Sequence, residues 1–511
     1  MAKKIFIYIA VIIACGFLFV FGSFLFMFLA PGAELFGIRY VAVGQGEYEL
    51  SKEKQIMPAF TGDIYIESKE IPIKVTFESI YNITMQFRQE FVGFTRSENK
   101  YPYIEYEVKN NNLHIKSFEL EEFLYNADSG DGRKSYLNLY LPITYQSRGI
   151  YIKSNNSVVK IDATACRNLS VLDVETSNEI FVYGSLSVNK LIVSTRKPID
   201  IGKNLNANHI KLTAGTNNVT INKDITGTLE VDAGSSTIFM GKVNNFIFKS
   251  SGGSIKPVED KKVIINKANI ETKSGNINID EITGAEESII KTLSGSVNIG
   301  SAQNLNLTNE RGPIEINSVG SAVITGGVGT VDVGSVSGKI SVTTKNGNVT
   351  LGDVETVINN PKVETNTGKI HVVNCAGTVN LISKNNLVDI TSKGASKVKI
   401  VAGRSVKAHG ITGELDVEAN GDVDLQVENL GGNIKVKTDD GCKNFKLDIN
   451  KYVLNDFNYH FKSTKGRMIN IYSGTKLLTE GKSEEKRSPY IAGLKTITIE
   501  TSYSDINVYT K

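Results

Sequence analysis

A short pattern that recurs about every 19 residues constrains the fold of this chain more than any other feature. Each copy has a polar turn with Gly or Asn, one variable residue, and then a β-branched, a polar and an apolar residue. Clear copies lie at 274–279 (SGNINI), 294–299 (SGSVNI) and 346–351 (NGNVTL). Alternating apolar and polar residues turn one face of a short strand toward a core. Gly or Asn in the turn predicts a positive φ where the chain bends sharply.

The first apolar residue of each copy defines a ladder of fifteen positions, and its fourteen steps range from 17 to 22 residues. One coil of this length cannot bury its apolar face, whereas stacked coils share a continuous core. We therefore predict an all-β chain that forms a single elongated β-solenoid, a right-handed parallel β-helix of about 15 rungs, rather than a β-sandwich. Extra half-motifs at Ile340 and Ile434 indicate two or three strands per coil. The ladder is Val158, Ile180, Ile199, Val219, Ile238, Ile255, Ile277, Val297, Ile314, Val331, Val349, Ile370, Val388, Val406 and Val423.

The amino-terminal segment is strongly apolar. Residues 5–30 contain no charge, Lys3 and Lys4 precede them, and Pro31 and Gly32 follow. About 20 apolar residues suffice to cross a bilayer as a helix, and basic residues favour the cytoplasmic side. We predict a single-pass transmembrane anchor with a cytoplasmic amino terminus and the bulk of the chain extracellular or periplasmic. A cleaved signal peptide remains an alternative. So does lipidation at Cys15, because 12–16 (IIACG) resembles a bacterial lipobox.

Charge and cysteine content narrow the function classes. Lys and Arg number 57 and Asp and Glu 54, which leaves a formal charge of +3 without a basic stripe, so we expect no nucleic-acid partner. The cysteines lack the spacing of a zinc site. Cys166, Cys375 and Cys442 are predicted to be buried small apolar residues, and one disulfide among them is the alternative.

No arrangement of polar residues predicts a reaction. The best acidic candidates are Asp439 and Asp440 before Gly441, which we interpret as a turn, and Asp422 with Asp424, which we interpret as solvated acids. Glu286 and Glu287, and Glu119, Glu121 and Glu122, are assigned to solvated loops, and the glycines of 326–329 (GGVG) to a tight β turn. We predict no catalytic, cofactor-binding or metal-binding residue, no cofactor and no small-molecule substrate. Three or more acids in one outer groove would favour a carbohydrate-active enzyme, whose chemistry uses paired carboxylates, and an outer face of scattered Thr, Lys and Asn would argue against it.

The five histidines, His114, His209, His371, His409 and His460, form no HxH or HExxH motif. His371 and His409 are 38 residues apart, about two coils, which would place them on one face about 10 Å apart if their coils were in register. That separation is too large for one shared metal ion, and exposed positions are the prediction for both.

Both ends of the repeat array have a different composition, with more Tyr and Phe. Because solenoids expose sheet edges at their ends, we expect β caps there. The predicted organisation is 1–40 for the cytoplasmic start, anchor and linker, 41–145 for an amino-terminal β cap, 146–440 for the solenoid and 441–511 for a carboxyl-terminal β cap.

The order of motifs resembles one bacterial family. After the apolar segment come 62–66 (GDIYI), 113–115 (LHI), 139–142 (LYLP) and 150–154 (IYIKS), and then the repeated SGxIxI rungs. This order is similar to that of the DUF4097-type adhesin family and its relatives with auto-transporter-adhesin-like head domains. The resemblance covers nearly all of residues 60–511. It implies a bacterial envelope protein with a β-solenoid and no known catalytic residues.

These observations predict a membrane-anchored, non-catalytic surface protein that acts as an adhesin or as a structural spacer. Its expected partners are the membrane, through the amino-terminal helix, and envelope polysaccharide or surface proteins. The alternative is an envelope scaffold or stress-response accessory that binds a partner membrane protein through the anchor and residues 41–145. A carbohydrate-active enzyme on a β-helix is the third possibility.

Overall fold

The chain forms two compact units, Met1–Val231 and Asp232–Lys511, and each is described by itself. The structure is a computed structural model. It describes residues 2–29, 34–35, 38–41, 49–68, 71–96, 104–117, 124–126, 135–165, 168–184, 186–201, 205–355, 361–449, 451–465, 467–479 and 484–511.

The first unit begins with helix α1 (Ala2–Leu29). Its apolar side chains are exposed, among them Ile12 and Phe17, which are 69% and 71% exposed. Within the part of the chain that the structure describes, no helix has the length and apolarity needed to cross a membrane. The membrane anchor stays a prediction.

A mixed sheet follows in the first unit, with strand order β1-β2-β6-β10-β5-β12-β14 and with β3 and β9 also paired to β6. Pairing around β6 is antiparallel and becomes parallel from β10 to β5 onward. The strands of this sheet are β1 (Glu34–Leu35), β2 (Ile38–Val41), β3 (Glu49–Ile56), β5 (Ile73–Glu78), β6 (Thr84–Arg96), β9 (Leu124–Asn126), β10 (Tyr136–Pro142), β12 (Val159–Asp162) and β14 (Ile180–Tyr183).

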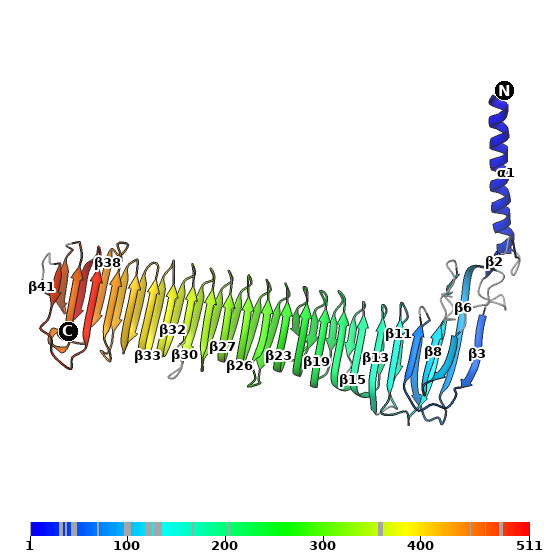
Figure 1. Cartoon of the computed structure of the whole chain (residues 1–511), viewed down its shortest axis with the longest axis horizontal. Coiled ribbons are helices and arrows are strands. Elements are labelled where there is room, and N and C mark those ends of the chain that lie inside the picture. The colour runs from blue at the N-terminus through cyan, green and yellow to red at the C-terminus, as the bar shows by residue number, and fades with distance from the viewer. Residues whose placement is uncertain are drawn as a thin grey trace. The chain divides into compact units, whose positions relative to one another are not determined.

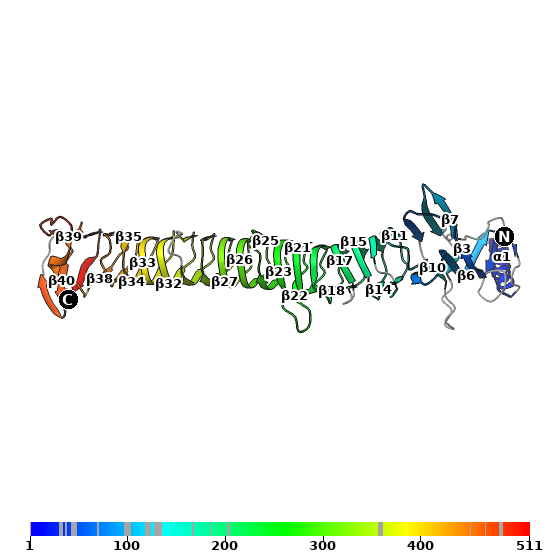
Figure 2. The ribbon, with the colours of Figure 1, turned by 90° about the horizontal axis from the view of Figure 1, so that it is seen from below.

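The second sheet of this unit carries the first coils and runs in the order β7-β8-β4-β11-β13-β15-β17-β19. The β7–β8 pair is a hairpin whose two turn residues, Asn110 and Asn111, have φ of 49° and 64°, as a tight hairpin turn requires. Figure 2 shows β7 projecting from the rest of the unit. The strands in this order are β4 (Ile64–Ser68), β7 (Ile104–Lys109), β8 (Asn112–Ser117), β11 (Gly149–Ser154), β13 (Asn168–Thr176), β15 (Leu186–Thr195), β17 (Leu205–Ala214) and β19 (Ile225–Ala233). Two short strands, β16 (Ile199–Ile201) and β18 (Val219–Ile221), pair with each other.

The second unit is a parallel β-solenoid with two sheet faces (Figure 1, green to red). One face comprises β20 (Ile238–Met240), β22 (Ile255–Pro257), β24 (Ile277–Ile282), β28 (Val331–Val336), β30 (Val349–Val354), β34 (Val406–Ile411), β36 (Val423–Val427) and β38 (Asn444–Ile449). The other comprises β21 (Lys242–Ser250), β23 (Ile264–Thr272), β25 (Ser288–Thr292), β29 (Ile340–Thr344), β31 (Lys362–Thr365), β35 (Glu414–Ala419) and β37 (Ile434–Thr438). Four long strands contribute to both faces: β26 (Val297–Asn309), β27 (Ile314–Gly326), β32 (Ile370–Ser383) and β33 (Val388–Ala402).

The predicted solenoid is confirmed by the register of its strands. Ile277 pairs with Val297, and Val297 pairs with Ile314, as successive ladder positions should. The half-motif residues Ile340 and Ile434 belong to the second face, where they pair with Ala322 and Leu415. In the second unit the same ladder continues in register through Val331, Val349, Ile370, Val388, Val406 and Val423.

The first ladder position was wrong by one residue. Val159, and not Val158, pairs with Ile180, and Val159 is fully buried. Because side chains alternate between the two faces of a strand, a shift of one residue exchanges the inner and outer sets. Two adjacent valines cannot be told apart by a pattern of apolar residues.

The prediction that the repeat glycines adopt a positive φ was also wrong. Gly275 and Gly295 are not among the glycines with positive φ. A Cβ on Gly295 would instead lie 1.9 Å from the carbonyl oxygen of Gly275 in the preceding coil, and one on Gly275 would lie 1.7 Å from the oxygen of Gly253. These glycines are needed because successive coils approach each other closely, and the same contact recurs at Gly312, Gly329, Gly347 and Gly368.

The carboxyl-terminal end has an out-of-order insertion. β43 lies between β37 and β39, and β44 lies between β38 and β40, all in parallel. The outermost coil is therefore formed by β39 and β40, which come earlier in the sequence. The last two strands, β43 and β44, form the coil beneath it. Two antiparallel strands, β41 and β42, cover the outermost coil. The elements are η1 (Leu454–Asp456), β39 (Asn458–Ser463), β40 (Ile469–Ser473), β41 (Lys476–Thr479), β42 (Glu485–Arg487), β43 (Thr496–Thr501) and β44 (Asp505–Thr510).

Candidate functional site

The acidic residues singled out in the sequence have structural partners. Asp439, Asp440 and Gly441 lie in the turn after β37, and Asp440 Oδ2 is 3.0 Å from Lys465 Nζ. Asp422 accepts hydrogen bonds from the backbone N–H groups of the next coil at 443 and 444, both at 2.9 Å. Glu286 lies in a bend and pairs with the Lys267 ammonium. Glu119, Glu121 and Glu122 lie outside the described residues.

Four of the five histidines lie near carboxylates, whereas His114 stacks on the Tyr65 ring. His371 Nδ1 lies 3.3 Å from Asp389 Oδ2, and His409 Nε2 lies 3.4 Å from Asp424 Oδ2. His409 is in register with Thr391 and not with the Asp389 that neighbours His371. The two histidines therefore occupy different rows and are not in register with each other. Across the described residues, no three or more His, Cys, Asp or Glu side chains gather as metal ligands.

The cysteine prediction is confirmed where the structure describes it. Cys375 and Cys442 are fully buried and are free thiols, and burial raises the pKa of the Cys375 thiol to about 12. Cys166 lies outside the described residues.

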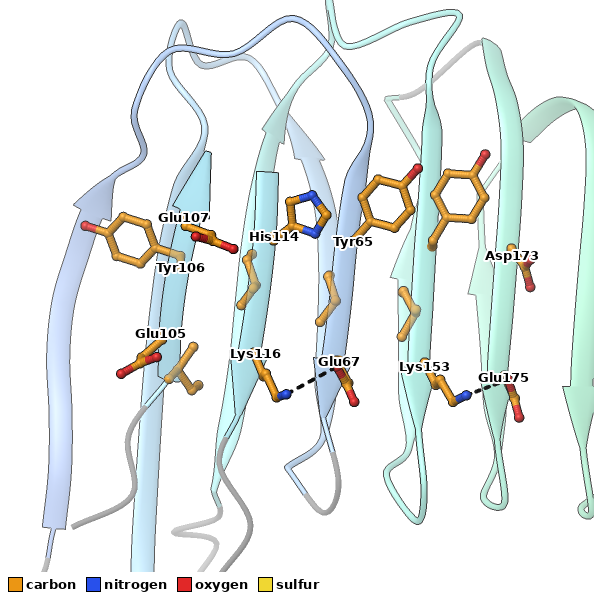
Figure 3. Close-up of a pocket in the computed structure, with 15 residues that line it drawn as sticks. Tyr65, Glu67, Glu105, Tyr106, Glu107, His114, Lys116, Lys153, Asp173 and Glu175 are labelled. Atoms are coloured by element: carbon orange, nitrogen blue, oxygen red, sulfur yellow. Dashed lines mark ion pairs between the residues drawn. The ribbon is translucent and has the colours of Figure 1, made fainter. Parts of the chain in front are cut away.

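The prominent candidate site is a groove that no acid or histidine motif predicted. It has a volume of about 820 Å³ and is lined by β7, β8, β4, β11 and β13 of the first unit (Figure 3). That volume is in the range of known ligand sites. Two neighbouring rows of outward side chains cross these strands, one of them aromatic and the other charged.

The aromatic row consists of His114, Tyr65 and Tyr151, which occupy matching positions on three adjacent strands. The ring centroids of His114 and Tyr65 are 4.9 Å apart, those of Tyr65 and Tyr151 are 4.7 Å apart, and both ring pairs are within 7° of parallel. This separation matches the spacing of neighbouring strands. Two acids continue the row, with Glu107 in register with His114 and Asp173 in register with Tyr151.

The charge row lies two residues further along the same strands. In spatial order it reads Glu105, Lys116, Glu67, Lys153 and Glu175, so acid and base alternate from strand to strand. Lys116 Nζ lies 3.8 Å from Glu67 Oε2, and Lys153 Nζ lies 3.8 Å from Glu175 Oε2, as the dashed lines of Figure 3 mark. Opposite charges on neighbouring strands favour this register.

Buried contacts behind the groove hold the aromatic row in place. The Tyr145 hydroxyl donates to the Gly149 carbonyl oxygen at 3.0 Å, and the Gly149 N–H donates to Asp63 Oδ1 at 2.7 Å. These bonds tie the start of β11 to the start of β4, the strands that carry Tyr151 and Tyr65. A Cβ on Gly149 would lie 2.6 Å from the Tyr151 ring, so glycine is needed there to make room for it.

Two groups at the β13 end of the groove have shifted proton affinities. Burial raises the pKa of the Tyr151 hydroxyl, and the carboxylates of Asp63 and Asp173 add to the increase. Burial also raises the pKa of the Asp173 carboxyl, the like charge of Glu175 adds to this, and Lys190 opposes it. This end of the groove therefore disfavours negative charge unless a cation is present.

Three segments of the sequence carry a signal for this site. The segments 64–66 (IYI), 113–115 (LHI) and 150–152 (IYI) share an apolar–aromatic–apolar pattern. The same segments are motifs of the family resemblance. The structure places them on adjacent strands with their central rings stacked. The pairing of segments that are 49 and 86 residues apart cannot be read from the pattern alone.

Comparisons with known proteins add little to this description. No protein-family model and no curated protein matches the chain, so the DUF4097-type resemblance stays a prediction. A crystal structure of a "putative cell adhesion protein" from Clostridium sporogenes is similar over 40% of this chain and 98% of that one. Sequence identity is 17% and the TM-score is 0.22. The fold assignment rests on the strand ladder of this chain.

Proposed function

We propose that this chain is a non-catalytic, adhesin-like binding protein of the bacterial envelope, anchored by its amino-terminal helix, with the groove as its binding surface. The groove is the observation that carries the proposal. Parallel rings beside a row of charged acceptors and donors suit a polyhydroxylated chain such as a polysaccharide, because hydroxyl groups hydrogen-bond to carboxylates while sugar C–H faces pack on rings. Its five strands span about 19 Å at a strand spacing of about 4.8 Å, which favours an extended ligand.

The binding test compares full-length protein with a variant that lacks two rings, Tyr65→Ala/Tyr151→Ala, in a pull-down with insoluble envelope polysaccharide. The matched control is Tyr81→Ala, since Tyr81 is fully exposed and lies outside the groove. We expect the double variant to lose at least tenfold in bound fraction and the control to lose nothing. Equal binding by all three proteins would remove the groove from the proposal.

Localisation is tested by protease shaving of intact cells that carry a carboxyl-terminal tag, with lysed cells as the reference. Loss of the tag on intact cells supports an extracellular solenoid. Loss only after lysis would restrict the protein to the periplasm or cytoplasm and end the surface-adhesin proposal.

The scaffold alternative assigns the same groove to a protein partner instead of a glycan. Three of its five strands, β4, β7 and β8, come from residues 41–145, the segment assigned to a protein partner. Deleting residues 1–40 separates the two functions. Glycan binding that survives the deletion supports the adhesin, whereas capture of a membrane protein that requires residues 1–40 supports the scaffold.

A carbohydrate-active enzyme is the third candidate, and one observation favours it: five acids line a single outer groove. Asp173 and Glu175 lie two residues apart on one strand, so both carboxyl groups point to the same face, and glycoside hydrolysis uses such a pair as acid and base. Release of reducing ends that is lost in Asp173→Asn would establish it. No release from a glycan that binds supports the non-catalytic proposal.

A further inference from the structure

The groove carries more negative charge than the chain around it. Five carboxylates and two lysine ammonium groups line it, which gives a formal charge of −3 when His114 is neutral. The whole chain has a formal charge of +3. The negative charge of the groove therefore comes from the residues that line it and not from the overall composition of the chain.

The two lysines of the groove are exposed, and acids on the neighbouring strands offset their charge. Lys116 stands in register between Glu105 and Glu67, and Lys153 stands between Glu67 and Glu175. Each ammonium group is thus flanked by an acid on both neighbouring strands. The acids of the charge row offset the charges of its two lysines. The remaining carboxylates leave the groove with a net negative charge.

The surplus of carboxylate lies at the two ends of the groove. Glu105 and Glu107 belong to β7 at one end, and Asp173 and Glu175 to β13 at the other (Figure 3). Among the described residues, Glu105, Glu107 and Asp173 have no basic group within ion-pairing distance. The four strand steps between the ends correspond to about 19 Å.

The β13 end is the better developed of the two cation sites. Asp173 is in register with Tyr151 and is half-buried beside Glu175. An ammonium group placed there meets two carboxylates and an aromatic ring, and both kinds of group attract cations. Burial raises the pKa of the Asp173 carboxyl, the like charge of Glu175 adds to this, and the nearby Lys190 opposes it.

We propose that the groove selects saccharide chains that carry free amino groups over the same chains in N-acetylated form. The inference rests on the proposed function and names the ligand class for that site. Ammonium groups about 19 Å apart match the acidic ends, while the hydroxyl groups between them meet the aromatic and charge rows. A second copy of this chain fits poorly, because two grooves of −3 repel, and a polyanion is excluded for the same reason.

The test measures affinities of the full-length protein in detergent micelles at pH 6 by calorimetry. The probes are a hexamer of glucosamine, a hexamer of N-acetylglucosamine and a hexalysine peptide. We expect the amino hexamer to bind about tenfold more tightly than the acetylated one, as a few half-exposed ion pairs provide. This preference should shrink in 0.5 M salt because the charges are screened.

The variant Glu105→Gln/Asp173→Asn should abolish the preference, so that its affinities for the amino hexamer and the acetylated hexamer become equal. The matched control is Glu418→Gln, an exposed outward glutamate on β35 outside the groove, which should retain the full preference. Circular dichroism confirms that each variant is folded.

Each remaining outcome decides the question. Equal affinities for the two hexamers overturn this inference and leave the proposed glycan-binding function standing. If hexalysine binds as tightly as the amino hexamer, the groove binds basic peptides. This result overturns the proposal that the ligand is a saccharide. Failure of both hexamers to bind removes the proposed function together with the inference.

Discussion

The glycine contact between coils leads to a sharp prediction, the effect of Gly295→Ala. The new Cβ would lie 1.9 Å from the Gly275 carbonyl oxygen and 2.6 Å from its carbon. A close but normal carbon–oxygen contact is about 3.3 Å, so the two coils must separate by about 1.4 Å at this point. Both clashing atoms belong to backbone, and no side-chain rotation relieves the overlap.

The cost follows from the hydrogen bonds that such a separation breaks. Ser294 N–H donates to the Lys273 carbonyl at 3.0 Å, and Leu293 N–H donates to the Thr272 carbonyl at 3.3 Å. Losing a buried backbone hydrogen bond costs about 1–3 kcal/mol. For two bonds, one of them near solvent, we expect a loss of about 3 kcal/mol in the free energy of local opening, or about 100-fold in the opening equilibrium.

Hydrogen exchange is the suitable assay, because stacked repeats open locally and need not unfold in one step. Amides of β25 and β26 should exchange about 100-fold faster in Gly295→Ala. The matched control is Gly215→Ala in a comparable turn, where the nearest atom to the new Cβ is Arg196 Cα at 3.9 Å. This control should be neutral or slightly stabilising. Unchanged exchange in Gly295→Ala, or equal losses in both variants, would refute the role given to close coil approach.

Three further predictions concern other parts of the chain. The Cys375 thiol, whose pKa burial raises to about 12, should resist a thiol reagent at pH 8 in the native protein and react fully after denaturation; fast native labelling would contradict its burial. The pKa of Asp173 is raised in the folded state, so ionisation of Asp173 costs stability as the pH rises through the folded-state pKa. Asp173→Asn should therefore stabilise the first coils at pH 7 and have no effect below about pH 3.9. Thermal melts at both pH values check this, and a pH-independent difference would contradict it. Val159→Ala should destabilise its coil by about 2 kcal/mol and Val158→Ala by far less, since only Val159 is fully buried; equal losses in hydrogen-exchange protection would reverse the register assigned here.

Much of the solenoid could be predicted because its determinants are local. In a coil of about 19 residues, the inward positions must be apolar and the flanking positions polar, and this pattern repeats along the chain. Ile277, Val297 and Ile314 were aligned correctly on that basis. The same rule failed at Val158 and Val159, where two adjacent apolar residues satisfy the pattern equally well and only packing selects one.

The groove could not be predicted in the same way, because it depends on pairings between distant segments. His114 and Tyr151 flank Tyr65 in space, yet they lie 49 and 86 residues beyond it in sequence. An outward aromatic residue on a single strand is unremarkable by itself. Stacked in register with two others and bordered by alternating charges, it becomes part of a binding surface.

By itself, the sequence determined the all-β class, the repeat length and which residues alternate between core and solvent, since all of these follow from short-range periodicity. Only the tertiary structure decided why the repeat glycines are needed, how β43 and β44 insert beneath the outermost coil, and which outward side chains meet. The physical reason is common to all three. Each depends on the distance between atoms of different coils, and that distance is set by strand register and close packing rather than by the order of neighbouring residues.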